Sequence, residues 1–405
     1  MNPQASPGDS LEIDQLRADT PGCSRIIHLN NAGSALPPSV VVETMIKHLR
    51  LEEMMGGYEA FQRESDRFKQ IYRSIATLLN AKPESIALTT SATEGWDRAF
   101  SAIAFTQNFT PDTRMLVSSS EYASNVLPMM QDAARTGASL EFIPDNAEGT
   151  TDLDALESML DSRVAVVAIN HCPSQNGLIN DVAGIGALLK RKGSQAWYLV
   201  DACQSVGQLP VDAPAIGADF ISATGRKFLR GPRGTGFLYC SDRAMTELEP
   251  FPIDLHSGLW TPTGYELREG AARFESWEKP YAALLGLGAA VEYALSLGID
   301  AIAERIGMLA SYTRRQIRSV PGATLLDRGK KLSGIVTFTD GNIVPREIVA
   351  GLHMNGVNVS LGTADYSQVD YLAHGVEALI RVSPHVFNTA EEIDSMANTV
   401  QSLVR

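Results

Sequence analysis

The chain has 405 residues, of which 44% are hydrophobic and 20% charged, so it is long enough to form two globular domains. No apolar run approaches the roughly 18 residues that span a bilayer. Lysine and arginine number 34 against 47 aspartates and glutamates, which gives a net charge of −13. Without a basic block, this charge argues against nucleic acid or an anionic membrane surface as a partner.

The first residues, MNPQASPGDSLEID, are polar and acidic, and they lack the basic and apolar stretches of a signal peptide. Four cysteines, Cys23, Cys172, Cys203 and Cys240, are too few and too scattered for a disulfide framework or a CxxC metal site. We therefore expect a cytoplasmic protein with reduced thiols and no bound metal.

Short β-rich runs alternate with helical stretches from about residue 84 onward. The predicted strands lie at 85–90, 115–120, 139–144, 164–170, 197–202, 219–224 and 234–239. Segments such as 152–160 and 182–192 between them carry helical patterns. Continuous apolar runs that alternate with helices predict an α/β fold with a mostly parallel seven-stranded sheet, covered on both faces.

The pattern changes after about residue 255, where a loop rich in Gly, Pro and Trp precedes two helical stretches and then shorter strands. We expect an N-terminal segment over 1–25, a large domain over 26–255 and a smaller C-terminal α+β domain over 256–405. Ligands of open α/β enzymes bind beyond the carboxyl ends of the strands. Functional residues should therefore follow the predicted strands.

Polar residues do follow three of these strands. Ser91 and Glu94 have capping-box spacing, and the helix N-terminus there suits a phosphate, although any helix needs a cap. Asp201 ends one of the most apolar strands, where it could be solvated, bind a metal or pair with a cationic ring nitrogen. Lys227 follows the next strand in a glycine-rich segment, and a lone lysine is usually solvated.

The combination of these residues predicts pyridoxal 5′-phosphate (PLP) as the cofactor. A lysine amine forms a Schiff base with the cofactor aldehyde, and a carboxylate that keeps the pyridine nitrogen protonated makes the ring an electron sink. Helix N-terminal amides and an arginine or threonine then bind the phosphate. A nicotinamide dehydrogenase is disfavoured because no G-x-G-x-x-G motif follows the first strands.

Six ordered motifs resemble those of the class V aminotransferase family of fold-type I PLP enzymes, which includes cysteine desulfurases and isopenicillin N epimerase-like proteins. The resemblance covers residues 26–405 and implies the fold-type I architecture. The motifs stand at His28–Gly33, Thr93–Gly95, Asp201–Gln204, Thr224–Lys227, Arg273–Glu275 and Arg381–Thr389.

The resemblance implies roles for individual residues around the cofactor. Lys227 corresponds to the lysine that links the cofactor and then moves the Cα proton. Asp201 corresponds to the partner of the pyridine nitrogen, and Gln204 to the donor to the phenolic oxygen. The implied phosphate ligands are Ala92, Thr93, Thr224 and Arg226.

The resemblance also implies the side of the site that binds the substrate. Tyr122 occupies the position where desulfurases stack a histidine on the cofactor ring, and a phenol can stack equally well. Arg381 corresponds to the guanidinium that binds the α-carboxylate of the substrate, although taken alone it could be an exposed arginine in a surface ion pair. The other implied substrate-binding residues are Asn31, Ala32, Gly33, Tyr58 and Ser174.

Several positions depart from the family pattern. The segment 360–381, where desulfurases carry a nucleophilic cysteine, contains no cysteine, so we do not expect desulfurase chemistry in its usual form. Trp277 and Glu278 replace a Gly-Thr pair whose threonine reaches the phosphate of the neighbouring subunit in relatives. Ser174 stands in place of an asparagine, and Ser360 in place of a second basic residue. The pocket is therefore predicted to accept a substrate other than free cysteine.

Three reactions are open to such an enzyme: transamination, epimerisation and expulsion of a β leaving group. The opening RADTPGC–HLNNAG and the segment 55–60 resemble ergothioneine-type C–S lyases, which cleave a cysteine S-conjugate or sulfoxide. Tyr122 could also act as an acid toward the departing sulfur. The sequence therefore favours a C–S lyase that acts on a small-molecule amino-acid substrate, a cysteine S-conjugate or sulfoxide, with an aminotransferase or epimerase as alternatives. A scaffold without turnover is disfavoured because Lys227, Asp201 and Arg381 are all retained.

Relatives form homodimers with active sites at the subunit interface, so the resemblance implies a homodimer here. Trp260 in the segment 256–260 and Trp277 after the Arg273–Glu275 motif are candidates for that contact. Both could equally be ordinary core residues.

Overall fold

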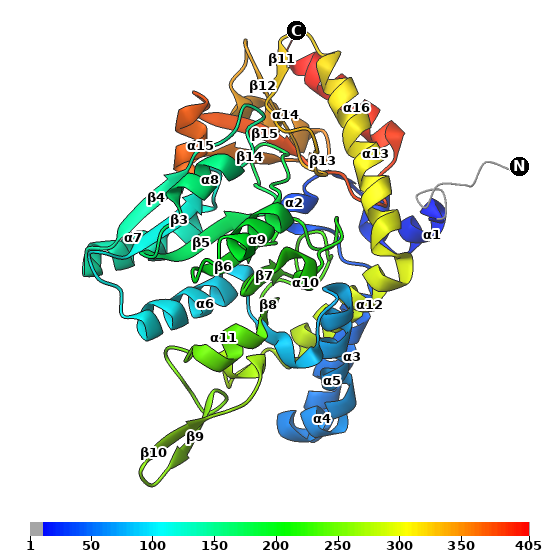
Figure 1. The fold of residues 1–405 in the computed structure, drawn as a ribbon. Coiled ribbons are helices and arrows are strands. Elements are labelled where there is room, and N and C mark those ends of the chain that lie inside the picture. Colours follow the sequence, from blue (N-terminus) through cyan, green and yellow to red (C-terminus); the bar gives the residue numbers. More distant parts are fainter. Residues whose placement is uncertain (1–10, 405) are drawn as a thin grey trace, which may run out of the picture.

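The computed structural model describes residues 11–404, and its centre is a seven-stranded sheet with the strand order β2-β8-β7-β6-β5-β3-β4 (Figure 1). The strands are β2 (Ile86–Thr89), β3 (Arg114–Ser118), β4 (Ser139–Ile143), β5 (Val164–Asn170), β6 (Trp197–Asp201), β7 (Phe220–Thr224) and β8 (Gly236–Cys240). Within this sheet only β8 runs antiparallel to its neighbours. The seven predicted strands and the mostly parallel sheet are confirmed.

Helices cover both faces of this sheet, which explains why its strands are continuously apolar. Val166 packs with Trp96 and Phe100 on one face, while the next residue, Val167, packs with Ile185 on the other. The helices that contribute to the two layers are α5 (Ser65–Leu78), α6 (Ala92–Gln107), α7 (Ala123–Thr136), α8 (Leu153–Met159), α9 (Val182–Arg191), α10 (Ala213–Ile216) and α11 (Asp242–Glu247).

The C-terminal part of the chain forms a second, antiparallel sheet with the strand order β11-β12-β15-β14. Its elements are β11 (Ala323–Leu325), β12 (Val336–Asp340), α14 (Pro345–Met354), β13 (Val357–Asn358), β14 (Ser360–Thr363), η5 (Ala364–Tyr366), α15 (Gln368–Ala373), β15 (Ala378–Val382) and α16 (Ala390–Leu403). Together with α13 (Ile299–Arg318), α14 and α16 enclose a separate hydrophobic core with this sheet.

Residues 13–85 join the two parts of the molecule. Their elements are α1 (Ile13–Ala18), η2 (Pro21–Ser24), β1 (Ile27–His28), α2 (Asn31–Ser34), α3 (Ser39–Met55), α4 (Gly57–Arg63) and, beyond α5, η3 (Pro83–Ser85). β1 pairs in parallel with β13 of the C-terminal part, whereas α12 (Tyr281–Leu297) packs against α3 and α5 beside the central sheet. The proposed division at residues 25 and 255 stays a prediction.

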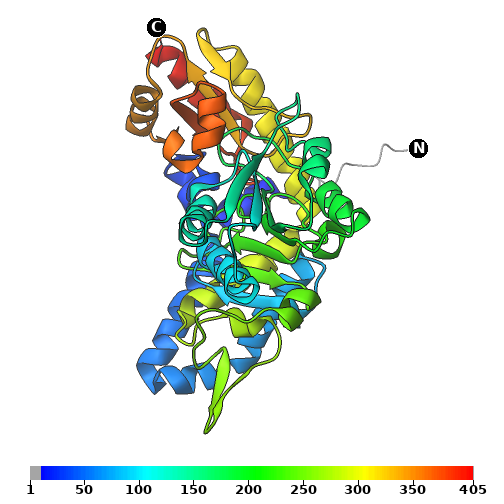
Figure 2. The same cartoon turned by 60° about the vertical axis from the view of Figure 1, so that its left-hand side comes forward.

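A hairpin of β9 (Gly258–Thr261) and β10 (Gly264–Leu267) projects from the body at the end opposite the C-terminal sheet (Figures 1 and 2). Trp260 at its tip is 92% exposed and Trp277 is 48% exposed, so neither is a core residue within one chain. The contact of both tryptophans with a second subunit stays a prediction.

Two general expectations concern membranes and metals. No single helix within residues 11–404 is long and apolar enough to cross a membrane; α12 and α13 would suffice only as a pair, and they meet at a bend of 82°. In the same part of the chain, no cluster of three or more His, Cys, Asp or Glu side chains is arranged to hold a metal ion.

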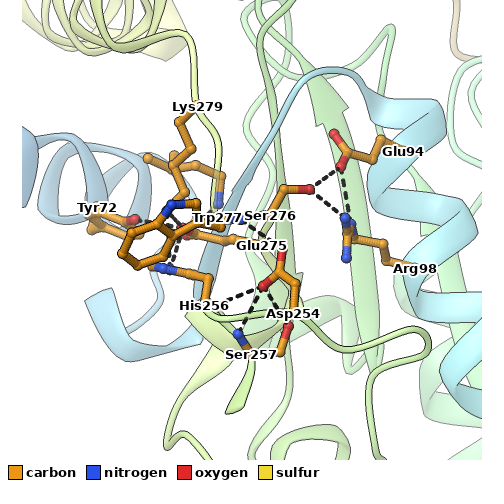
Figure 3. Close-up of polar contacts among 11 residues, drawn as sticks. Tyr72, Glu94, Arg98, Asp254, His256, Ser257, Glu275, Ser276, Trp277 and Lys279 are labelled. Atoms are coloured by element: carbon orange, nitrogen blue, oxygen red, sulfur yellow. Dashed lines mark hydrogen bonds and ion pairs between the residues drawn. The ribbon is translucent and has the colours of Figure 1, made fainter. Parts of the chain in front are cut away.

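The Arg273–Glu275 motif connects the segment after η4 (Ala271–Phe274) to β2 at the edge of the central sheet (Figure 3). Glu275 is fully buried and accepts hydrogen bonds from Leu88 N at 2.7 Å and from the Tyr72 hydroxyl at 2.9 Å. It also pairs with Lys279, and with His256 at 3.1 Å. Burial and the Glu275 charge both raise the pKa of Tyr72, which keeps its phenol protonated as a donor.

Replacing Glu275 should therefore strongly destabilise the fold. Glu275→Ala leaves the buried Leu88 amide and the Lys279 amine without their acceptor, and we expect it to lower the free energy of unfolding by about 3–5 kcal/mol. The measurement is the urea midpoint of the purified protein. Glu247→Ala, which removes an exposed ion pair with Arg243, is the matched control and should cost less than about 1 kcal/mol. Equal losses in the two variants would contradict the anchoring role.

Candidate active site

A cavity of about 160 Å³ lies beyond the carboxyl ends of the central strands, where β14 and β15 approach them. It brings together residues from distant parts of the sequence. Eight of the predicted site residues line it: Ala32, Gly33, Tyr122, Ser174, Gln204, Arg226, Lys227 and Arg381. The fold therefore gathers most of the predicted site in one place.

Asp201 and Lys227 meet because β6 and β7 are adjacent parallel strands. Asp201 is the last residue of β6, and Lys227 follows β7 by three residues; they are 5% and 9% exposed. The Asp201 carboxylate accepts hydrogen bonds from Cys203 N and from Asn125 Nδ2, both at 2.8 Å. Burial raises the pKa of Asp201, while the nearby charge of Lys227 lowers it. Neither a solvated carboxylate nor a metal cluster describes Asp201 here.

The turn after β6 is packed tightly against the loop that carries Lys227. Gly207 has a φ of +88°, and a Cβ atom there would lie 2.5 Å from the backbone of Phe228, so glycine is required. Within this turn, Gln204 Nε2 donates to the carbonyl of Ala32 at 3.1 Å. Its Oε1 is buried without a hydrogen-bond partner. A buried amide oxygen left unpaired suggests a missing ligand at this point.

The predicted phosphate ligands lie at the start of α6 and after β7. Ser91 caps α6 by accepting from Glu94 N at 3.0 Å, but the Glu94 carboxylate accepts from Thr90 N instead of returning to the Ser91 amide. Only half of the expected capping box therefore forms. Ala92 and Thr93, in the first turn of α6, have the position that exposes helix N-terminal amides to an anion.

A close approach between β8 and its neighbours sets where this helix begins. A Cβ atom on Gly236 would lie 2.6 Å from the backbone of Ser91 and 2.7 Å from the carbonyl of Ala223. The Thr224 hydroxyl donates to the Thr235 carbonyl at 3.2 Å, and Arg226 Nη1 donates to the carbonyl of Gly33. Ala92, Thr93 and Thr224 do not line the 160 Å³ cavity, whereas Arg226 does.

Arg381 projects from β15 into the other side of the cavity, opposite Ser360 on β14. Its Nη1 donates to the Ser174 carbonyl at 3.4 Å, and its Nε is buried without a partner. Burial lowers its pKa, an effect that the phenols of Tyr371 and Tyr122 oppose. Within residues 11–404 it forms no ion pair with a carboxylate, so the guanidinium can bind an incoming carboxylate.

Three tyrosines surround this guanidinium. Tyr122 precedes α7, and its ring is parallel to that of Tyr366, with centroids 6.2 Å apart and planes 5° apart. Tyr371, which lines the cavity behind them, is buried. Burial and the neighbouring Cys203 raise the pKa of Tyr122, so its phenol remains a proton donor. Tyr366 and Tyr371 were not predicted as site residues. Both lie in the segment 360–381, which contains no cysteine.

Some predicted residues lie outside the cavity. Tyr58 is 77% exposed on α4, and the structure does not bring it to this chain's own cavity. Asn31 is fully buried and donates to the Ser383 carbonyl at 2.7 Å, which fixes the turn that presents Ala32 and Gly33. Trp277 is exposed, with its backbone amide bonded to Asp254 at 2.8 Å (Figure 3).

The fold and the cavity together define a fold-type I PLP-dependent enzyme. The sequence matches the model of the family described as Aminotransferase class-V over residues 27–396. The chain belongs to this family, as its motifs suggested.

Relatives extend over nearly the whole chain. A protein named "Probable cysteine desulfurase" from Methanothermobacter thermautotrophicus is 28% identical over 400 residues, which are 97% of this chain and 98% of that protein. The apo structure of a cysteine desulfurase from Thermococcus onnurineus superposes with a TM-score of 0.88 at 26% identity, covering 96% of this chain and 98% of the other. The cystine C–S lyase C-DES, solved with cysteine persulfide, has a TM-score of 0.84 at 23% identity, with coverage of 94% and 99%; this likeness shows the fold.

PLP is the cofactor of this class, and the residues present fit it. The cavity offers a buried amine, a nearby buried carboxylate, the Gln204 amide, whose Nε2 carries a second N–H besides the one donated to Ala32, and the positive charges of Arg226 and Arg381 for anionic groups. When bound, PLP supplies an electron sink for charge that develops at the Cα atom of an amino acid. The protein is thus a PLP-dependent class V enzyme that acts on an amino acid.

Lys227 is expected to be indispensable for the covalent attachment of PLP. Lys227→Ala removes the only amine in the lining of this cavity, so the purified variant should lack the visible absorbance band of lysine-linked PLP and all activity. Absorbance spectra after reconstitution with PLP measure this directly. Lys69→Ala, which removes an exposed lysine outside the cavity, is the control and should retain the band. A Lys227→Ala protein with an unchanged band would contradict the assignment.

Proposed function

We propose that this enzyme cleaves the C–S bond of a cysteine S-conjugate or sulfoxide by β-elimination. The observation that carries the proposal is the wall of the cavity formed by residues 360–381. It presents Tyr366 and Tyr371 beside the carboxylate-binding Arg381, and no cysteine. The cofactor and carboxylate machinery is kept, while the sulfur acceptor of a desulfurase is not.

The remaining thiol at the site does not replace that acceptor. Cys203 lies near Lys227, but burial raises its pKa more than Lys227 lowers it. A neutral thiol is a poor nucleophile, so Cys203 is not suited to take up sulfur as a persulfide. A substrate that brings its own sulfur leaving group needs no such acceptor.

The proposed roles follow the geometry and the family motifs. Lys227 links the cofactor and moves the proton at Cα, and Arg381 holds the α-carboxylate. Asp201 would pair with the protonated pyridine nitrogen, and the Gln204 amide would donate to the phenolic oxygen. The proposed phosphate ligands are Ala92, Thr93, Thr224 and Arg226. Ala32, Gly33 and Ser174, which line the cavity, contact the substrate.

Tyr122 is proposed as the acid that protonates the departing sulfur. Its side chain lines the cavity and is stacked against the ring of Tyr366, and its raised pKa keeps the proton available across the neutral range. The overall reaction consumes R–S–CH₂–CH(NH₃⁺)–COO⁻ and one water, and it releases R–SH, pyruvate and ammonium. One C–S bond and one C–N bond break, and no external oxidant or reductant is needed.

An assay with cysteine S-conjugates distinguishes this reaction from its rivals. We expect the PLP-loaded enzyme to release pyruvate and thiol in equal amounts from an S-alkyl or S-aryl cysteine without any keto acid present. Pyruvate is measured by coupled reduction and the thiol by a colorimetric reagent. A requirement for a keto acid would favour an aminotransferase, and exchange of the α-proton with no pyruvate would favour an epimerase.

Tyr122→Phe should slow this elimination while the cofactor remains bound. Loss of a general acid typically costs 10²–10⁴-fold, so we expect kcat to fall by about that range for a conjugate with a poor leaving group. An S-conjugate whose thiol is strongly acidic should lose much less. Tyr366→Phe, which removes the neighbouring hydroxyl but keeps the ring, is the matched control. Equal losses for good and poor leaving groups would contradict the role of Tyr122 as an acid.

We also propose that the active form is a homodimer, as family membership suggests. Exposed apolar side chains on and near the projecting hairpin support this, namely Phe251, Leu255, Leu259, Trp260, Tyr265 and Trp277. A contact with a second copy would remove this apolar surface from water. Tyr58 and Glu278, which are far from this chain's cavity, stay candidates for a contribution across that contact.

A further inference from the structure

Behind Asp201 lies a second buried carboxylate to which neither the family motifs nor the proposed reaction gives a role. Glu121 follows β3 in the turn before α7 and is 2% exposed. It does not line the active-site cavity, and it directly precedes Tyr122 in the chain. A fully buried glutamate is rare unless its charge is paired or absent.

One amide group connects the two carboxylates. Asn125 Nδ2 donates one hydrogen bond to Glu121 Oε1 and another to Asp201 Oδ2, both at 2.8 Å. An asparagine amide nitrogen has two N–H groups, so both are committed to these carboxyl groups. Asp201 Oδ1 is held separately by Cys203 N. The orientation of Asp201 is therefore set from behind by Asn125, and the orientation of Asn125 by Glu121.

The other neighbours of Glu121 are uncharged. Its Oε1 also accepts from Tyr122 N at 3.1 Å, and the Ser118 hydroxyl lies 3.1 Å from Oε2. The charged group that acts on it is Asp201, which is itself paired electrostatically with Lys227. No cation contacts Glu121 among the described residues. Ionising both of two buried carboxylates that share one amide costs much free energy when only one of them has a cation nearby.

We propose that Glu121 is a positioning residue for the cofactor site: through the side-chain amide of Asn125 it fixes the Asp201 carboxylate, and it does so as an uncharged carboxylic acid. This inference rests on the proposed role of Asp201 toward the pyridine nitrogen. Burial and the charge of Asp201 raise the pKa of Glu121 to about 8, which agrees with the acid form at neutral pH. Asp201 is then the single negative charge that faces the ring.

The consequence concerns the strength of cofactor binding. A neutral Glu121 orders Asn125 without adding a second negative charge, so the protonated pyridine nitrogen meets one well-oriented carboxylate. Without Glu121, the Asn125 amide loses an acceptor in a buried place and can turn away from Asp201. The cofactor would then bind to a carboxylate that is no longer held in one orientation.

The test uses full-length protein and three readouts other than turnover. They are the PLP dissociation constant of the apoprotein, the pH midpoint of the visible band of the loaded protein, and the infrared band of a protonated carboxyl group. Glu121→Gln is isosteric with the acid, and we expect its dissociation constant and midpoint to stay within about twofold of the parent value. The infrared band should be present in the parent and absent in this variant.

Glu121→Ala should weaken PLP binding by about tenfold, and so should Asn125→Ala, which provides the test if Glu121→Ala does not fold. Asp219→Asn is the matched control, since Asp219 is a buried carboxylate at the opposite end of β7 that bonds to Tyr198 N at 3.0 Å. It should affect stability without changing the band or PLP affinity.

Three results would overturn the inference. A lower pH midpoint in Glu121→Gln would mean that a negative charge had been removed, because an anion stabilises the protonated linkage. Absence of the infrared band in the parent would show an ionised Glu121. Unchanged PLP affinity in both alanine variants would exclude positioning. Asp201→Asn distinguishes a failure of this inference from a failure of the proposed role of Asp201. If Asp201→Asn also leaves the PLP affinity and the pH midpoint unchanged, the proposed role of Asp201 itself fails.

Discussion

The burial of charged groups beyond the carboxyl ends of the central strands is the constraint on which the site depends. Asp201 and Lys227 are brought out of water at the ends of adjacent parallel strands, and their opposite charges offset part of that cost. The surrounding backbone and side chains must supply the remaining hydrogen bonds. The Cys203 amide and Asn125 do so for Asp201, and they leave the Lys227 side of the cavity available for chemistry.

A second constraint is the connection between the N-terminal segment and the C-terminal sheet. β1 pairs with β13, the amide of Ala32 donates to the Ser383 hydroxyl at 2.8 Å, and the carbonyl of Ala32 accepts from Gln204. The turn at residue 32 therefore ties the end of β6 to the end of β15. Because Arg381 lies two residues before Ser383, this tie fixes the distance between Arg381 and the Lys227 side of the cavity.

The side chains of the segment 360–381 decide which chemistry this framework of strands and turns presents to the cavity. The segment forms one wall of the cavity, and within it the pairing of β14 with β15 holds Ser360 opposite Arg381. Within that frame, residues 360–381 present the phenols of Tyr366 and Tyr371 to the cavity and contain no thiol. Phenols with raised pKa values donate protons and stack on planar groups, whereas a thiolate attacks sulfur. The chemistry of this wall is therefore that of phenols and not of a thiolate.

The sequence by itself determined the strands, the positions of Asp201 and Lys227 at their ends, and the cofactor that this pair suits. These features depend on local patterns, since apolar runs form buried strands and parallel strands place their ends together. Only the tertiary structure decided that Glu121 and Asn125 stand behind Asp201, that Tyr366 faces Tyr122, and that Tyr58 lies away from the cavity. Those relations join residues far apart in the chain, and packing distances, which no local pattern encodes, set them.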